Sequence, residues 1–166
     1  MSIAWGASGA LVSGTTSLSI AYPTGITAGQ LLVVCICSKY PTNGPADISG
    51  WTKLTSDSSG QAPGIDVGNT RSTIFYKTAD GTESGTLSVT LASCNTCVGI
   101  MFRYTKSNRT WLINYATGTR NSNVDPWTGG NAVTATSDPG LTAGDMLLMC
   151  VAMNGNVKTF ISQAVT

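Results

Sequence analysis

The feature that most limits the fold of this chain is a succession of short apolar or alternating runs, each ended by turn-forming residues. Residues 86–92 alternate strictly, so that Leu87, Val89 and Leu91 face one way and hydroxyl side chains face the other. A period of two is typical of a strand with one buried face, because successive side chains of a strand point to opposite faces. Helical spacing of apolar residues is nearly absent, and the only glutamate is Glu83. The chain is therefore expected to be all-β.

Similar runs recur along the chain, separated by clusters of Gly, Pro, Asn, Asp and Ser. Residues 79–81 are expected to form a tight turn, because Asp-Gly is a favoured turn pair, and residues 60–68 and 121–131 are expected to be loops. Many short strands separated by turn signals predict an antiparallel β-sandwich of jelly-roll or immunoglobulin-like type, in one domain covering residues 1–166. About nine to ten strands are expected, at residues 17–22, 30–38, 50–54 (a short strand or a loop anchored by Trp51), 72–78, 86–92, 98–105, 112–117, 132–136, 145–153 and 159–165.

One segment occurs twice, 115 positions apart. Residues 25–36 (GITAGQLLVVCI) align with residues 140–151 (GLTAGDMLLMCV), with identity at the first Gly, Thr-Ala-Gly, the central Leu and the Cys. Either a generic turn and core strand is used twice, or two pseudo-repeat units begin near residues 25 and 140. Because only about fifteen residues follow the second strand, we expect either a C-terminus that is incomplete or a last strand that pairs with another subunit.

Composition excludes several classes of function. The chain contains no His, which excludes a Ser-His-Asp triad, a Cys-His pair and an HExxH zinc site. With a net charge of +1, the chain lacks the excess of basic residues that is typical of nucleic-acid-binding proteins. No apolar run approaches the roughly 18 residues of a membrane helix. All eight carboxylates lie in or beside turn signals, where Asp bonds nearby backbone N–H groups. We therefore expect no enzyme activity, no cofactor, no metal, no nucleic acid and no membrane partner.

The five cysteines leave several possibilities open. Cys94 and Cys97 form a CxxC motif, and Cys35 and Cys37 lie on one face of an expected strand. Two such pairs could in principle hold zinc. A redox-active CxxC favours a helix N-terminus, whereas this one lies between two expected strands, where a local turn disulfide is another possibility. Buried or half-buried free thiols are the default for all five, Cys150 included.

The aromatic residues also allow more than one role. Trp51, Trp111, Trp127 and Tyr115 are expected to plug the ends of the sandwich, to anchor a protein interface, or to form a platform on which sugars stack. Trp5, near the N-terminus, either packs on the first strand or reaches a neighbouring molecule.

The surface is expected to be poor in charge. Gly, Ser and Thr make up 61 of 166 residues, and only 10% of residues are charged, against about 25% in an ordinary soluble domain. Charged residues are depleted at the cores of protein interfaces. A surface of Thr and Ser on strands and turns is therefore suited to being covered by other protein subunits.

Several motifs resemble those of β-rich virion proteins of tailed bacteriophages. The likeness covers most of residues 15–105 and returns at 140–153, and the Cys94–Cys97 motif is not part of it. The motifs are a Ser/Thr-rich first strand, the Gly-Ile-Thr-Ala-Gly-Gln-Leu-Leu turn and strand from Gly25, Gly50-Trp51, the Phe75-Tyr76-Lys77 strand ending before Gly81, and Leu87–Thr90. The resemblance implies a head decoration (cement) protein or a tail or fibre component, located on the virion surface after assembly in the host cytoplasm. Its partners would be other virion subunits and copies of itself.

Under this interpretation the candidate contacts are Trp5, the loop at residues 121–131 with Asp125 and Trp127, and exposed edge strands, which offer unpaired backbone groups. The alternative is a carbohydrate- or receptor-binding module of the tail-fibre or adhesin type. Its candidate glycan-binding residues are Trp51, Trp111, Tyr115 and Trp127.

Overall fold

The computed structural model describes residues 3–39, 44–59, 70–91, 94–107, 111–113, 118–119, 134–135, 146–149 and 161–164. Within these ranges the chain is all-β, every paired strand is antiparallel, and no helix occurs. Eight strands lie before residue 107, and the strands after it are shorter. The strands are β1 (Ile3–Ser8), β2 (Val12–Gly14), β3 (Ser17–Ala21), β4 (Leu31–Lys39), β5 (Thr52–Ser59), β6 (Thr70–Thr78), β7 (Thr86–Thr90), β8 (Thr96–Lys106), β9 (Gly118–Thr119), β10 (Thr134–Ala135), β11 (Met146–Met149) and β12 (Ile161–Ala164).

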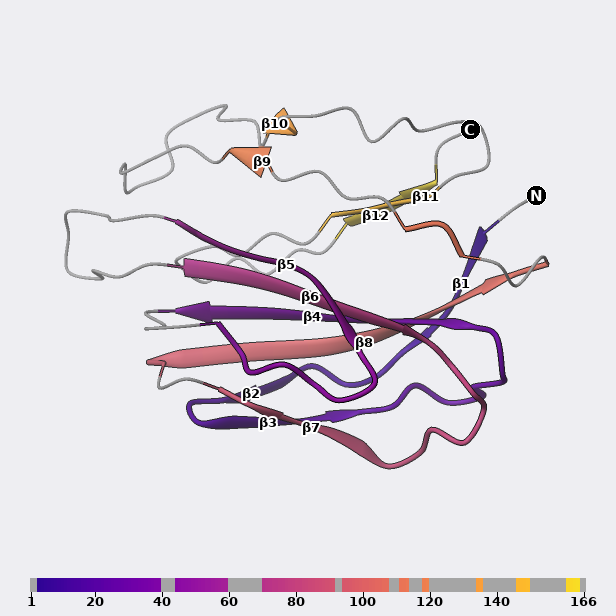
Figure 1. Ribbon diagram of the computed structural model, residues 1–166, viewed down its shortest axis with the longest axis horizontal. Coiled ribbons are helices and arrows are strands. Elements are labelled where there is room, and N and C mark those ends of the chain that lie inside the picture. Colours follow the sequence, from indigo (N-terminus) through magenta and orange to yellow (C-terminus); the bar gives the residue numbers. More distant parts are fainter. Residues whose placement is uncertain are drawn as a thin grey trace.

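The main sheet has the strand order β1-β8-β4-β6-β5, and β2 pairs with β8 beside β1 (Figure 1). β4 lies at the centre, and all nine of its residues pair without a register shift with β6 on one side and β8 on the other. This position explains the continuous apolar run from Leu31, because a central strand covered on both faces needs apolar side chains at successive positions. From Leu31 to Ile36 every side chain of β4 is buried.

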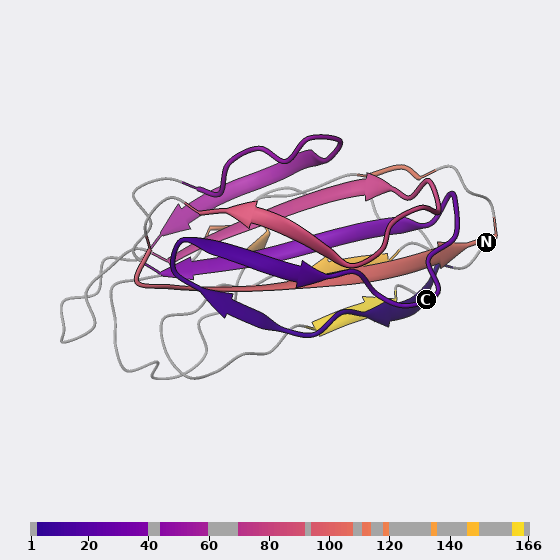
Figure 2. The ribbon, with the colours of Figure 1, turned by 90° about the horizontal axis from the view of Figure 1, so that it is seen from below.

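The β3–β7 pair covers one face of the main sheet, and Figure 2 shows it in front of that sheet. Its inward side chains pack with those of β4, β6 and β8 in a first core cluster. Gly99 of β8 allows this close approach: a Cβ there would lie only 2.9 Å from Cδ1 of both Leu18 and Ile20. The first core cluster has twelve buried members among the described residues: Leu18, Ile20, Leu32, Val34, Ile36, Phe75, Ala79, Val89, Leu91, Cys94, Cys97 and Met101.

The opposite face of the main sheet carries a second core cluster. Its buried members among the described residues are Leu31, Val33, Cys35 and Tyr104. The half-buried side chains that pack against them come partly from chain that follows β8: Trp111, Ile113, Met146 and Leu148. β11 and β12 lie above this face in Figure 1.

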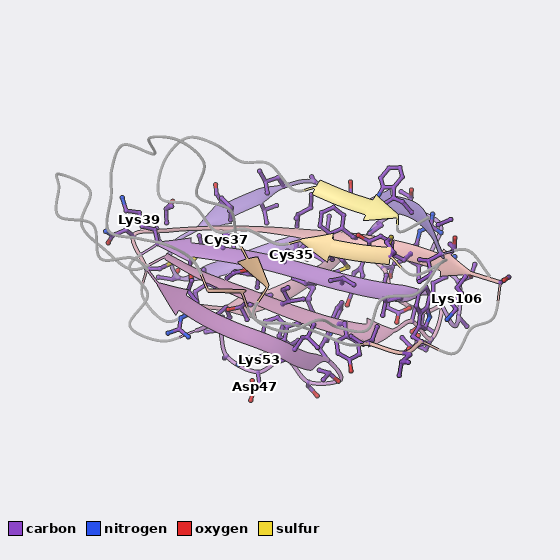
Figure 3. All side chains as sticks on the ribbon, turned by 90° about the horizontal axis from the view of Figure 1, so that it is seen from above. Cys35, Cys37, Lys39, Asp47, Lys53 and Lys106 are labelled. Carbon is purple, nitrogen blue, oxygen red and sulfur yellow. The ribbon has the colours of Figure 1, made fainter. Side chains whose placement is uncertain are left out.

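Each of the two edge strands of the main sheet contains a register shift in its pairing. β1 has a register shift between Trp5 and Ala7, and β5 has one between Lys53 and Thr55. Such bulges disturb the regular row of unpaired backbone groups on an edge strand. Lys53 of β5 also forms an ion pair with Asp47, which lies in the segment before β5 (Figure 3).

The outer edge of β7 meets the segment at residues 44–51. The Ala46 N–H donates to the Thr90 carbonyl at 3.2 Å, while Ile48 and Trp51 pack against the first core cluster. This segment therefore closes the first cluster beside β7.

Most of the predicted strands are confirmed within two or three residues at each end. Leu87, Val89 and Leu91 point inward as expected, and Ser88 and Thr90 are exposed. The predicted turn at residues 79–81 is present between β6 and β7.

Other predictions meet the structure less well. β1 and β2 were not predicted, because their many glycines and small residues hide the alternation. The strand expected at residues 112–117 is wrong for Leu112 and Ile113, which lie outside any strand, and its remainder lies outside the described residues. So do the expected loops at residues 60–68 and 121–131. In the second copy of the repeated segment, β11 begins at Met146. Met146 is equivalent to Leu31 of the first copy, where β4 begins.

Candidate functional site

Trp5 is the predicted contact residue that the structure leaves open to solvent. It lies on β1, an edge strand of the main sheet, opposite Tyr104 of β8. Its side chain is 60% exposed, although Tyr104 is buried. The only other large hydrophobic side chains that are exposed in the described part of the chain are Leu11 and Leu112, at 45% and 83%. An exposed Trp is a frequent anchor of protein interfaces, because it offers a large rigid contact area.

Gly6, next to Trp5, stands at the register shift of β1. A Cβ at Gly6 would lie 3.1 Å from the guanidinium carbon of Arg103. Glycine at this position therefore leaves room for the Arg103 side chain beneath the edge strand. The bulge and the arginine together set the path of β1 around Trp5.

Trp51 and Trp111 lie against opposite faces of the main sheet. Trp51 packs on the first core cluster, as does Tyr22. Trp111 packs on the second cluster, and its Nε1–H donates to the Gly29 carbonyl at 2.8 Å. The Lys106 ammonium lies 5.6 Å from the centroid of the Trp111 ring. The two indoles therefore do not form one common platform for a ligand.

The interface candidate Asp125, the glycan-binding candidate Tyr115 and Trp127, which is a candidate for both roles, lie outside the described residues.

The first copy of the repeated turn, at residues 25–30, is held by a small polar network. The Thr27 N–H donates to Gln30 Oε1 at 2.9 Å, and the Gln30 N–H donates back to the Thr27 carbonyl at 3.3 Å. Arg103 of β8 donates from Nη1 to the Gly25 carbonyl at 2.5 Å and to Gln30 Oε1 at 3.3 Å. Gly25 and Gly29 have φ values of 70° and 85°, in the left-handed region that favours glycine. The Gly-x-Thr-Ala-Gly-Gln motif is thus a turn tied to the sheet.

The turn after β6 is joined to the repeated turn through the backbone. The Gly29 N–H donates to the Ala79 carbonyl at 2.8 Å, and the Ala79 N–H donates to the Gln30 carbonyl at 2.7 Å. Gly81, with a φ of 93°, sits so close to Ala28 that a Cβ would lie 3.0 Å from its backbone nitrogen. The two turns therefore pack as one unit at this end of the sheet.

Glu83 lies at the centre of this turn unit, with only 4% of its side chain exposed. Its Oε1 lies 2.7 Å from the Lys77 ammonium and accepts from the Asp80 N–H at 3.0 Å, while Oε2 accepts from the Gly81 N–H at 2.9 Å. Asp80 in turn accepts from the N–H and the hydroxyl of Thr82 at 2.8 and 2.5 Å. These carboxylates stabilise the turn, as their position beside turn signals indicated.

The pKa values in the turn unit follow from this geometry. Burial acts to raise the pKa of Glu83, but the Lys77 ammonium and the backbone N–H groups outweigh it and hold the pKa below its usual range. Burial acts to lower the pKa of Lys77, and Glu83 and Asp80 together raise it overall. The pKa of Tyr22 is raised mainly by burial. Lys77 and Glu83 therefore both remain charged at neutral pH.

The cysteines divide between the two faces of the sheet. Cys94 and Cys97 belong to the first core cluster and Cys35 to the second, and all three are buried. Cys37 is half-buried, and these four cysteines are thiols that form no disulfide, as the default interpretation predicted. The four-cysteine zinc site considered from the sequence is wrong, because the main sheet separates the two pairs. The structure groups no three metal-ligating side chains anywhere within its described ranges.

Comparison of the chain with known proteins identified no relative. Searches against family models, curated proteins and solved structures found no match to the chain.

In the residues that the structure describes, no helix is long and apolar enough to cross a membrane.

Two residues that organise this end of the molecule were not among the predicted site residues. Arg103 bonds a turn 78 positions away, and Glu83 joins Lys77 to two backbone N–H groups. The only available signal was rarity: Glu83 is the one glutamate of the chain, placed two residues after Asp80-Gly81.

Proposed function

We propose that this protein is a structural subunit of a tailed-phage particle, either a capsid decoration (cement) protein or a tail-associated subunit. It acts by protein–protein contact with other virion subunits and with copies of itself, on the virion surface. The observation that carries the proposal is Trp5, a largely exposed indole on an edge strand of the main sheet.

The charge distribution supports a contact role. The chain has only 17 charged residues, and several of those described are paired within the molecule, among them Lys77 with Glu83 and Lys53 with Asp47. Covering such a surface with another protein has a low desolvation cost, because few unpaired charges leave water.

We infer further that the architecture is a β-sandwich. The β3–β7 pair and the main sheet enclose the first core cluster between two layers, as in a sandwich. We propose that this sandwich is of the jelly-roll or immunoglobulin-like type.

The proposal is tested with purified heads and tails of the phage whose genome encodes the chain. Fluorescently labelled protein is mixed with heads in one arm and with tails in the other, and is sedimented through sucrose. We expect saturable co-sedimentation with one of the two. A protein that stays monomeric at high concentration and sediments with neither would refute the proposal.

The same protein applied to a glycan array tests the carbohydrate-binding alternative. With Trp51 and Trp111 on opposite faces, that alternative depends on Tyr115 and Trp127. Glycan binding that is lost on Trp127→Ala, with no binding to heads or tails, would favour the alternative.

A further inference from the structure

Two thiols lie together where the β7–β8 connection enters β8. Cys97 is the second residue of β8 and is fully buried, while Cys94 precedes the strand and is 7% exposed. Both side chains belong to the first core cluster, and the Cys94 thiol is close enough to contribute to the raised pKa of the Cys97 thiol. The sulfur atoms of the CxxC motif are thus already neighbours in the reduced protein.

The backbone around Cys94 is fixed to two other segments. Its N–H and its Sγ–H both donate to the Thr15 carbonyl, at 3.3 and 3.2 Å. The Leu91 N–H donates to the Thr16 carbonyl at 2.9 Å, and the Asn95 N–H donates to the Lys39 carbonyl at 3.0 Å. The β2–β3 turn and the end of β4 therefore hold the CxxC segment in place.

Neither Cys35 nor Cys37 lies on the face of the main sheet where a disulfide with Cys94 or Cys97 could form. In the register of the main sheet, Cys97 stands opposite Ser38 of β4, so the two share a face. Cys37 and Cys35 alternate with Ser38 and point to the other face. A disulfide from either of them to Cys94 or Cys97 would have to pass through the sheet.

We propose that Cys94 and Cys97 form an intramolecular disulfide when the protein meets a low-molecular-weight disulfide. The thiolate of Cys94, the slightly exposed member, attacks the S–S bond of the oxidant and releases one small thiol. Cys97 then loses its proton to solvent and attacks Sγ of Cys94, which releases the second small thiol. Two protein thiols are oxidised to one S–S bond, and the oxidant is reduced to two thiols. The bond fixes the entry of the chain into β8.

The reaction is slow because the pair is buried. Burial, with Cys94 as the next contribution, raises the pKa of the Cys97 thiol to about 12, and the neighbouring Ser38 acts in the opposite direction. A thiol with such a pKa is almost entirely protonated at neutral pH, and the thiolate is the nucleophile. Where and when oxidation occurs rests on the proposed function: a subunit assembled in a reducing cytoplasm would be oxidised after release of the particle. The chemistry itself does not depend on that function.

The test uses the full chain treated with oxidised glutathione at neutral pH, quenched in acid and alkylated under denaturing, non-reducing conditions. Weighed before alkylation, the oxidised protein should be about 2 Da lighter than the reduced protein. The disulfide should map to the peptide that contains residues 94–97. Cys94→Ser and Cys97→Ser should each abolish the mapped bond. Cys35→Ser, a buried cysteine on the other face, is the matched control and should keep it.

Five alkylated thiols after prolonged oxidation, or a bond mapped to Cys37 or Cys150 instead, would overturn the proposal. A measurement on the unmutated protein guards against variants that fail to fold: the midpoint of thermal unfolding should rise on oxidation and return with dithiothreitol. Because no phage particle enters these measurements, their failure would leave the binding of heads or tails unaffected.

Discussion

The two faces of the main sheet are closed in different ways. The face toward β3–β7 holds twelve buried residues among those described, all lying between Leu18 and Met101. The face toward β11 holds four, and its cover includes Trp111, Ile113, Met146 and Leu148, which follow β8 in the chain. The first face is therefore completed by the same stretch of chain that builds the sheet, whereas the second depends on later segments. We expect the buried residues described on the first face to contribute more to stability than those described on the second.

The largest expected effect compares one phenylalanine from each face. Phe75 is fully buried in the first cluster, and Phe102 is half-buried beside the second. Phe75→Ala should lower the free energy of unfolding by about 4 kcal/mol, because it leaves a cavity in a closed core. Phe102→Ala should lower it by only about half as much, because less apolar surface returns to water. Urea unfolding measures both, and equal losses would contradict the comparison.

A smaller loss is expected where β3 meets β8. In Gly99→Ala the new methyl group would press on Leu18 and Ile20, which should lower the free energy of unfolding by about 2 kcal/mol. Adding Ile20→Val removes one of the two methyl groups in the way and should restore part of the stability. Urea unfolding of the single and double variants measures this coupling. Purely additive losses would argue against close packing of the two layers.

The turn unit gives a pH-dependent test. Because the folded state lowers the pKa of Glu83, the carboxylate contributes stability above its unfolded pKa of about 4.3, and this contribution is lost as the pH falls through the lower folded value. Glu83→Gln should cost about 1.5 kcal/mol at pH 7. It should also flatten the fall of the unfolding free energy between about pH 5 and pH 3. An unchanged acid slope in the variant would show that Glu83 does not carry the effect.

The smallest expected effect concerns the second face. Trp111→Phe keeps an aromatic ring against the second cluster but removes the hydrogen bond to the Gly29 carbonyl. We expect a loss of about 1 kcal/mol in the free energy of unfolding, measured in urea. A loss as large as that of Phe75→Ala would mean that the second face is the more important one.

The sequence allowed much of this fold to be predicted, for physical reasons that particular residues show. The alternation around Val89 and the apolar run of β4 come directly from one-sided and two-sided burial, so period and length identified them. β1 escaped prediction because Gly6 and a bulge break its period beside Trp5. Its place is decided by pairing with β8, almost one hundred residues away, which no local pattern encodes.

The site was less predictable than the fold. Trp5 is exposed and Trp51 is half-buried because of the edge or face that each indole meets. Nothing in the sequence around the two residues indicates this difference. The partnership of Arg103 with the repeated turn likewise requires the register of β8 beside β4.

The claim that this chain works by protein contact is tested most directly on Trp5. Trp5→Ala should weaken co-sedimentation with heads or tails at least tenfold, a change of about 1.4 kcal/mol. It should leave the free energy of unfolding within about 0.5 kcal/mol of the unmutated protein, because the side chain is mostly exposed. Leu112→Ala, which removes another exposed apolar side chain, is the matched control and should bind normally. Unchanged binding by the Trp5→Ala protein would contradict the account.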